Sequence, residues 1–278
     1  MKTYWRILSH LSTVLVLLTF WAGSRAFGQT LKVGVAPHTS SRLILEQYQP
    51  LRQQLEKALG HEVEVMTAPD FTEFTRRALK QDYDLVITTG HQARLFQADG
   101  HYLPLVTYQA DFKSLVIVAK NGSVLKPKDL EHTTVIGLSG SSLVTLWGQH
   151  WLKRTECRQV TVRYVSAADS VAQLLLTGEG SAGFVSLTNF QKLTPTVQAG
   201  LRILAESPPM LGRVYLLNSH QGTLQPRIEK ALWSFSKTPE GQLYFKKNQL
   251  GGYRKLRGGE LASMEPYAEE VRKNLVPR

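Results

Sequence analysis

Cysteine is almost absent from this 278-residue sequence, and histidine forms no regular pattern. The single cysteine, Cys157, excludes an internal disulfide and any zinc site built from several cysteines. The eight histidines are scattered and none stands at a metal-ligand spacing, so we predict no metal site. The Gly-x-Ser-x-Gly elbow of many hydrolases is also missing, and no base, nucleophile and orienting residue form a recognisable set. We therefore expect a protein that is not an enzyme and that uses no cofactor.

Long apolar runs are missing as well. The N-terminal run at 11–22 has 12 residues, short of the ~20 that a membrane-spanning helix needs. It follows the cations Lys2 and Arg6 and precedes small residues around Ala26. This order is typical of a secretory signal peptide, so we expect residues 1–28 to be removed on export. No cysteine lies near the junction, and we therefore predict a periplasmic protein that is not a lipoprotein.

Acidic residues are outnumbered by basic ones. The 33 Lys and Arg against 22 Asp and Glu give a formal charge of +11, and subtracting the three cations of residues 1–28 leaves +8. Exported proteins seldom meet nucleic acid, so we predict no nucleic-acid partner. A small anionic ligand or an anionic membrane surface explains the charge better. The basic run at 246–257 is interrupted by glycines and is interpreted as a solvated face.

Short apolar strands alternate with amphipathic helices along the chain, which is typical of an α/β protein with mostly parallel sheets. Two such runs, 31–107 and 114–204, suggest two lobes with a cleft between them. Ligands of open α/β sheets lie beyond the carboxyl ends of the strands. Strands are expected at 31–36, 63–65, 84–87, 103–107, 114–119, 135–136, 160–164, 182–185, 201–204 and 214–217.

A loop of small hydroxylated residues, Ser139, Gly140, Ser141 and Ser142, stands between a strand and a helix. The first N–H groups of a helix lack partners and carry the positive end of its dipole, so they attract anions. The three hydroxyls would add donors, and the glycine would allow a close approach. The alternative is that Ser141 or Ser142 only caps the helix, as serine commonly does.

Other polar segments also follow predicted strands. Thr39 lies in the loop at 37–41, while Thr89, Gly90 and His91 lie in a polar loop at 88–91. A further polar loop is expected at 186–189. A lone histidine such as His38 or His91 is more often a surface or capping residue, but its place at a strand end makes it a candidate. Since these loops share the carboxyl ends of strands, we favour a ligand role for the serines.

Seven short segments, taken in order, carry a resemblance to a known family: 31–35, 55–60, 68–71, 83–86, 125–130, 207–209 and 238–241. The chain resembles the substrate-binding proteins of phosphonate and phosphite ABC transporters. The resemblance implies a two-lobed type II periplasmic-binding-protein fold, in which each lobe is a mostly parallel sheet flanked by helices and two hinge crossings join the lobes. The loop at 139–142 stands where members have a Ser-Thr-Ser-Gly anion loop.

The chain departs from this family at three places. Thr88 and Thr89 stand where members tend to have an aromatic residue, Ser166 and Ala167 replace an expected histidine, and 186–189 holds no acid to meet a ligand amine. We therefore expect a small phosphonate- or phosphite-like oxyanion rather than an aminoalkylphosphonate.

These expectations combine into one prediction. Lobe 1 is formed by 29–109 and 211–278 and lobe 2 by 110–210, with crossings near 108–112 and 207–212. A small anion is bound between them, by Ser139, Gly140, Ser141 and Ser142 on one side and by Thr39, Thr89, Gly90 and His91 on the other. The resemblance implies a monomer that docks on the membrane permease of an ABC transporter. The same fold used as the input of a membrane sensor protein is the alternative.

Overall fold

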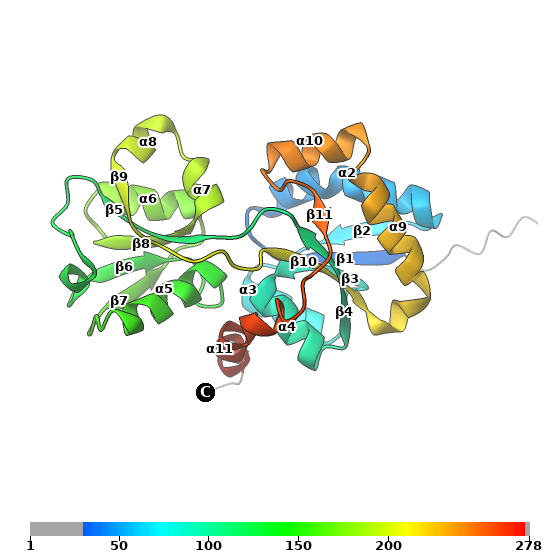
Figure 1. The fold of residues 1–278 in the computed structure, drawn as a ribbon, viewed down its shortest axis with the longest axis horizontal. Coiled ribbons are helices and arrows are strands. Elements are labelled where there is room, and N and C mark those ends of the chain that lie inside the picture. Colours follow the sequence, from blue (N-terminus) through cyan, green and yellow to red (C-terminus); the bar gives the residue numbers. More distant parts are fainter. Residues whose placement is uncertain (1–29, 276–278) are drawn as a thin grey trace, which may run out of the picture.

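The structure, a computed structural model, describes residues 30–275, and the predicted signal peptide lies outside this range. Two β-sheets, each covered by helices, lie side by side along the long axis of the molecule (Figure 1). We call the six-stranded sheet with its helices lobe 1 and the five-stranded sheet with its helices lobe 2. The two-lobed α/β class expected from the sequence is confirmed.

The strands of lobe 1 stand in the order β11-β4-β10-β3-β1-β2 and those of lobe 2 in the order β7-β6-β8-β5-β9. In lobe 1 the strands are β1 (Leu31–Val35), β2 (Val63–Met66), β3 (Leu85–Thr89), β4 (Tyr102–Tyr108), β10 (Arg213–Asn218) and β11 (Tyr253–Arg254). In lobe 2 they are β5 (Ser114–Ala119), β6 (Thr134–Gly137), β7 (Thr161–Tyr164), β8 (Ala182–Ser186) and β9 (Leu201–Glu206).

The helices cover the sheets as separate sets. Lobe 1 carries α2 (Ser41–Leu59), α3 (Phe71–Leu79), α4 (Gly90–Asp99), α9 (Gln225–Phe235), α10 (Pro239–Lys247) and α11 (Glu265–Leu275), with 3-10 turns η3 (Ser219–Leu224) and η4 (Ala262–Met264). Lobe 2 carries α5 (Leu143–Arg154), α6 (Ala168–Leu176), α7 (Leu187–Gln191) and α8 (Pro195–Ala199), with the 3-10 turn η2 (Pro127–Leu130). Within residues 30–275, no helix combines the length and hydrophobicity needed to cross a bilayer.

Strand direction follows from where the chain crosses between the sheets. β1 pairs in parallel with β2 and β3, whereas β10 is antiparallel to both β3 and β4. In lobe 2, β6 pairs in parallel with β7 and β8, and β5 is antiparallel to β8. β5 and β10 each begin directly after a crossing. β10 therefore starts at the edge where β3 ends, and β5 starts at the edge where β8 ends. The carboxyl ends of β1, β3, β6 and β8 consequently face the other lobe.

Local sequence signals place the helices of lobe 1 correctly. The Ser40 side chain accepts a hydrogen bond from the N–H of Leu43 at the start of α2, and Gly60 ends that helix with a left-handed φ of 66°. The Asp70 carboxylate accepts from the N–H of Glu73 at 2.8 Å, as the capping pattern predicts. The apolar positions of α2 point into the core: Ile44, Tyr48, Leu51, Leu55 and Leu59.

Two segments, 109–113 and 207–212, carry the chain between the sheets, close to the predicted crossings. They pair with each other. The N–H of Phe112 donates to the carbonyl of Met210 at 3.0 Å, and the N–H of Met210 returns a bond of 2.8 Å. The proposed lobe boundaries at 109/110 and 210/211 both fall within these segments and stay predictions.

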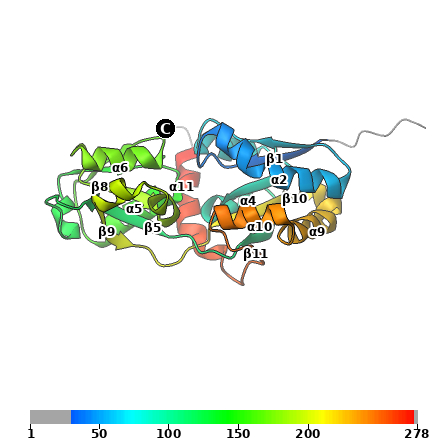
Figure 2. The same cartoon turned by 90° about the horizontal axis from the view of Figure 1, so that it is seen from above.

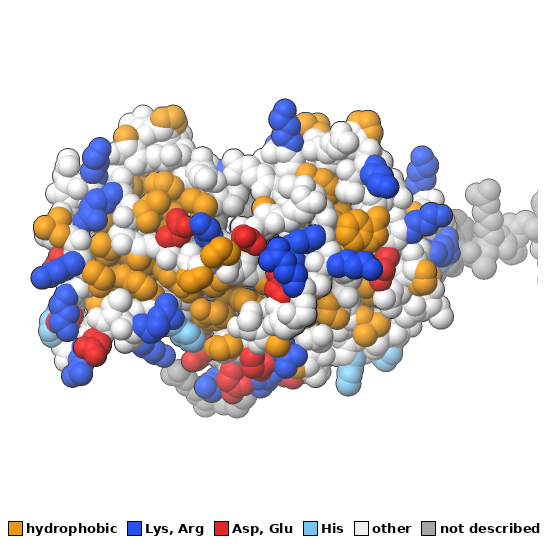
Figure 3. Space-filling model, viewed as in Figure 1, with side chains coloured by type: hydrophobic (Ala, Val, Ile, Leu, Met, Phe, Trp, Pro, Cys, Tyr) orange, Lys and Arg blue, Asp and Glu red, His pale blue; other side chains and the backbone are white. Residues whose placement is uncertain are grey.

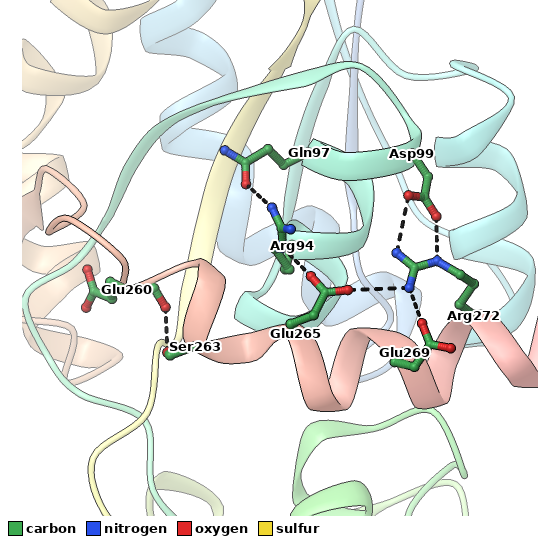
Figure 4. Close-up of polar contacts among 8 residues, drawn as sticks. All are labelled: Arg94, Gln97, Asp99, Glu260, Ser263, Glu265, Glu269 and Arg272. Carbon is green, nitrogen blue, oxygen red and sulfur yellow. Dashed lines mark hydrogen bonds and ion pairs between the residues drawn. The ribbon is translucent and has the colours of Figure 1, made fainter.

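Helix α11 lies between the two lobes when the molecule is seen from above (Figure 2). Ion pairs join it to α4: Arg272 pairs with Asp99 at 2.8 Å, and Arg94 pairs with Glu265 (Figure 4). On the side of lobe 2, the ring of Tyr267 stacks on His150 of α5 with centroids 5.0 Å apart. α11 is therefore attached to lobe 1 and packs against lobe 2.

Two predicted polar loops are not loops in the structure. Thr88 and Thr89 are the last residues of β3, and α4 begins at Gly90. Ser186 ends β8 and its hydroxyl accepts from the N–H of Asn189, so the segment at 186–189 opens α7. The expectation of loops at 88–91 and 186–189 was wrong because a strand can pass directly into a helix when a small polar residue occupies the N-cap position.

Candidate functional site

The polar segments predicted to bind a ligand lie on the edges where the two sheets face each other. Thr39 follows β1 and Thr89 ends β3, while the loop at 139–142 follows β6. The parallel pairing of β1 with β3 brings the first two to one edge of lobe 1. The space between these edges is the place where open α/β sheets bind ligands.

The loop at 139–142 is ordered by its own hydrogen bonds. The N–H of Ser142 donates to the Ser139 carbonyl at 2.9 Å, and the N–H of Ser141 donates to the Ser139 hydroxyl at 3.2 Å. The Ser142 side chain accepts from the N–H of Thr145 at 3.4 Å and donates to the Thr145 hydroxyl at 2.9 Å. Ser142 therefore caps α5, which is the alternative that the sequence left open.

Capping leaves part of the helix start free. Among residues 30–275, the N–H groups of Leu143 and Val144, the first two residues of α5, form no hydrogen bond. The Ser141 hydroxyl likewise forms no hydrogen bond with a described residue. Ser139, Gly140 and Ser141 line a cavity of about 420 Å³ together with Thr72, Leu146, Gln149, Tyr164, Glu270 and Asn274. The loop thus presents donors to a space bounded by both lobes.

His91 connects the two lobes. Its Nε2 lies 2.9 Å from the carbonyl oxygen of Ser141, and its Nδ1 lies 3.1 Å from the hydroxyl of Thr89. Because a carbonyl only accepts, Nε2 carries the proton and Nδ1 accepts from Thr89. His91 has no exposed surface, and burial lowers its pKa to about 4. His91 is therefore neutral at pH 7, and it hydrogen-bonds the predicted anion loop itself.

Gly90 and Thr39 have different surroundings from the other predicted residues. A Cβ atom on Gly90 would lie 2.8 Å from the carbonyl oxygen of Leu211, so glycine is needed for the contact between α4 and the second crossing. Thr39 is exposed. The structure thus brings Thr89, His91 and Ser141 into contact and lines a cavity with Ser139 and Gly140. Ser142 acts as a cap, and Gly90 is a packing position.

Sequence reasoning missed two cations, Arg213 and Lys192, that lie on the same edges beside the candidate His38. Arg213 is the first residue of β10 and stands opposite Thr89 in the sheet. Lys192 ends α7 of lobe 2, and His38 follows β1. The sequence signal for Arg213 was its position as a cation at the start of an apolar strand, shortly after Pro208 and Pro209 in the second crossing. That signal is weak, because a charged residue at a strand end is usually solvated.

These cations influence one another electrostatically. Burial, and after it the charge of Arg213, lowers the pKa of His38 to about 3. Burial, followed by the charges of Arg213 and Lys247, also lowers the pKa of Lys192. The three residues come from both lobes and lie on the side of the molecule where α7, α2 and α10 are found (Figure 1). On that side the outline of the molecule has a notch between α8 and α10 (Figure 3).

Buried tyrosines stand behind Arg213. The Tyr108 hydroxyl lies 2.8 Å from that of Tyr215 and 2.6 Å from that of Tyr244. Burial raises the pKa of all three, so they are neutral at pH 7. Burial alone would lower the pKa of Arg213, but the tyrosine oxygens around it more than offset this. Arg213 keeps its charge, and no tyrosine neutralises it.

A larger cavity of about 570 Å³ lies within lobe 1 and is lined by residues such as Arg94, Leu105 and Arg257. Since none of its lining residues comes from lobe 2, it does not lie between the sheets. In the part of the chain from 30 to 275, no group of three or more His, Cys, Asp or Glu side chains is arranged to hold a metal ion.

The fold is shared with solved binding proteins. PhnD1 from Prochlorococcus marinus, in complex with methylphosphonate, has a TM-score of 0.77 at 15% identity, over 89% of this chain and 99% of that one. XAC2383 from Xanthomonas citri, bound to chloride, has 0.75 at 19% identity, over 88% and 99%. The alkanesulfonate-binding protein SsuA from Xanthomonas axonopodis pv. citri, bound to MOPS, has 0.59 at 15% identity, over 90% and 94%. No curated protein sequence matches the chain.

At these identities the solved structures show the fold alone, and the family rests on sequence. The profile of the family described as "ABC transporter, phosphonate, periplasmic substrate-binding protein" matches residues 33–258. This range includes both crossings, the loop at 139–142 and all eleven strands, the first of them from its third residue. The chain belongs to the family of the periplasmic substrate-binding proteins of phosphonate ABC transporters.

Proposed function

We propose that the protein captures a small phosphonate- or phosphite-like oxyanion between its two lobes and delivers it to the membrane permease of an ABC transporter. The start of α5 carries this proposal. The free N–H groups of Leu143 and Val144 lie at the positive end of the helix dipole, where oxyanions bind. The Ser141 hydroxyl adds a donor from a residue that already touches lobe 1 through His91.

Several solved structures with this fold hold anionic ligands, while others hold arginine or glutamine. PhnD1 holds methylphosphonate, SsuA holds the sulfonate MOPS, and XAC2383 has been solved with chloride and with ATP. Each of these ligands is negatively charged or carries a charged oxyanion group. They support the chemical class of the ligand for this chain, which combines the same fold with hydroxyl and amide donors.

The cavity offers little to a ligand amine. Among the residues that the structure describes, Glu270 is the only acidic one that lines the cavity beside the serine loop, and it lies 3.8 Å from Nε2 of His150. Burial lowers the pKa of His150, while the charge of Glu270 acts in the opposite direction. A ligand ammonium group at this cavity would have one partly exposed carboxylate to meet. This supports the expectation that aminoalkylphosphonates are not the ligand.

Closure of the lobes on the ligand is the expected motion. The paired segments around Phe112 and Met210 are the connections that would bend, as in other hinged binding proteins. The hydrogen bond from His91 to Ser141 belongs to the closed arrangement because it joins the two lobes. The closed, ligand-bound form is the form that would dock on the permease.

Titration calorimetry of the purified protein tests this function. The panel is phosphate, phosphite, methylphosphonate, sulfate and methanesulfonate, with 2-aminoethylphosphonate as the zwitterionic comparison. We expect saturable binding of at least one simple oxyanion and weaker binding of the amine-bearing ligand. A folded, cooperatively melting protein that binds no member of the panel would contradict the proposed function.

A further inference from the structure

The cations Arg213 and Lys192, which lie with the neutral His38, have no counter-charge. Within residues 30–275, neither Arg213 nor Lys192 takes part in an ion pair, and neither side chain donates a hydrogen bond. Outside the β-sheet pairing, the hydrogen bond found at Arg213 involves its backbone, since its carbonyl accepts from the Thr107 hydroxyl at 2.8 Å. Arg213 is partly buried. A guanidinium with five donors rarely lies partly buried without an acceptor.

Two further polar atoms beside Arg213 are also without partners. Tyr48 has no exposed surface, and its hydroxyl forms no hydrogen bond among the described residues. The Nδ1–H of His38 donates to the Ala36 carbonyl at 2.8 Å. Its buried Nε2 has no hydrogen bond of good geometry, although the nearby Gln47 side chain acts to raise the pKa of His38. The rings of His38 and Tyr48 lie edge to face with centroids 6.4 Å apart. Buried polar groups are normally paired, so these atoms indicate that a ligand completes the group.

The position of the group ties it to the site between the lobes. Arg213 stands opposite Thr89 in the antiparallel pair of β10 and β3, and Thr89 donates to His91, which donates to Ser141. Lys192 comes from the other lobe, at the end of the helix that follows β8. The unpaired cations therefore flank the contact between the lobes, and they come from both sides of it.

We propose that Arg213 of lobe 1 and Lys192 of lobe 2 together bind a dianionic oxyanion, so that the ligand carries two negative charges and its charge draws the lobes together. This inference rests on the proposed function. It adds to that function the charge of the ligand and the residues that recognise that charge. Two cations that approach each other across a closing cleft repel, and a ligand of charge −2 removes that repulsion where a monoanion removes only part of it. Arg213 can also bind two oxygen atoms with its fork of donors.

A comparison of matched anions tests the charge. Methylphosphonate at pH 8 is compared with its monomethyl ester, which differs by one methyl group and one charge. Sulfate is also compared with methanesulfonate, in which a methyl group replaces one oxygen atom and one charge is lost. We expect the dianion of at least one pair to bind about 10-fold or more tightly than its monoanion, the range of a charge-assisted hydrogen bond. Equal affinities within both pairs would overturn the proposal.

Three variants test the residues. Arg213→Gln is expected to weaken binding of the preferred dianion about 10- to 100-fold, and Lys192→Gln about 3- to 10-fold because Lys192 is more exposed. Lys237→Gln is the control, since Lys237 is an exposed lysine between α9 and α10 whose side chain makes no hydrogen bond with any described residue. It removes the same charge and should leave the affinity unchanged.

Arg213→Lys keeps the proposal testable if the glutamine variant does not fold. The lysine retains the positive charge but lacks the paired N–H donors of the guanidinium. The preference for the dianion should therefore persist while the affinity falls. Unchanged affinity in the Arg213 and Lys192 variants, with wild-type protein binding oxyanions, would overturn this inference and leave the proposed function standing. Wild-type protein that binds no anion would instead contradict the proposed function, and this inference with it.

Discussion

The Nε2 of His91 donates a hydrogen bond of 2.9 Å to the carbonyl oxygen of Ser141, and this bond links the start of α4 in lobe 1 to the serine loop of lobe 2. Thr89 fixes the tautomer by donating to Nδ1 at 3.1 Å. The bond places a titratable group at the contact between the lobes. The loop predicted to bind the ligand is therefore also the loop by which lobe 2 contacts lobe 1.

The buried His91 should make stability fall in mild acid. Its pKa is about 4 in the folded protein and about 6.5 in an unfolded chain. Between these values the unfolded chain binds more protons, so stability is complete above pH 6.5 and declines as the pH falls toward 4. The slope from this one histidine is about 1.4 kcal/mol per pH unit. Chemical denaturation at several pH values measures it.

A variant separates His91 from the other histidines. His91→Gln can still donate to Ser141 but does not titrate, so the slope between pH 6.5 and 4 should decrease. His220→Gln, at an exposed position, is the control and should retain the wild-type slope. A wild-type slope in His91→Gln would show that another group causes the acid sensitivity.

Gly90→Ala should destabilise the protein by about 1–3 kcal/mol, the usual range for overpacking. The added methyl group would meet the Leu211 carbonyl at 2.8 Å and push on the second crossing. Gly222→Ala is the matched control, because nothing lies within 4 Å of a Cβ atom there. Thermal melts of both variants measure the difference, and equal melting temperatures would contradict the packing role of Gly90.

Two neighbouring serines should behave differently. Ser142→Ala removes the cap of α5 and should cost about 1 kcal/mol of stability. Ser141→Ala removes a hydroxyl that faces the cavity, so it should weaken oxyanion binding and leave the melting temperature close to wild type. Melting curves and calorimetry on both variants test the assignment. The reverse pattern would mean that Ser141 is the structural residue and Ser142 the ligand residue.

Arg272→Met should cost about 1 kcal/mol or less, although Arg272 pairs with Asp99, Glu265 and Glu269 (Figure 4). The reason is that its side chain is 33% exposed, so water screens these pairs. Arg158→Met, at an exposed position outside such a network, serves as the control. A loss of several kcal/mol would show that the attachment of α11 depends on this network rather than on its apolar face.

The fold could be predicted from the sequence because its signals are local. Examples are the apolar spacing of α2, the Asp70 cap of α3 and the glycine at 60 that ends α2. Each depends on residues close together in the sequence, and all are present in the structure. The strand ends were also located, which brought Thr89, His91 and Ser141 to the correct edges. The direct passage from β3 into α4 was missed, because polar residues at a strand end also fit a loop.

Arg213, Lys192 and Tyr48 could not be found in the same way. They lie far apart in the chain and come together only through the order of strands and the crossing between lobes. His38 was noticed as a lone histidine, but its burial and its neighbour Arg213 are properties of the folded chain. A grouping that depends on tertiary structure leaves no periodic pattern in the sequence.

A crystal structure of the protein with methylphosphonate tests the central claim most directly. We predict density for one molecule between the sheets, in contact with the loop at 139–142 or the start of α5 and with the Arg213 guanidinium. Density in the cavity of lobe 1 beside Arg94 and Arg257, with the space between the sheets filled only by protein and water, would contradict the account.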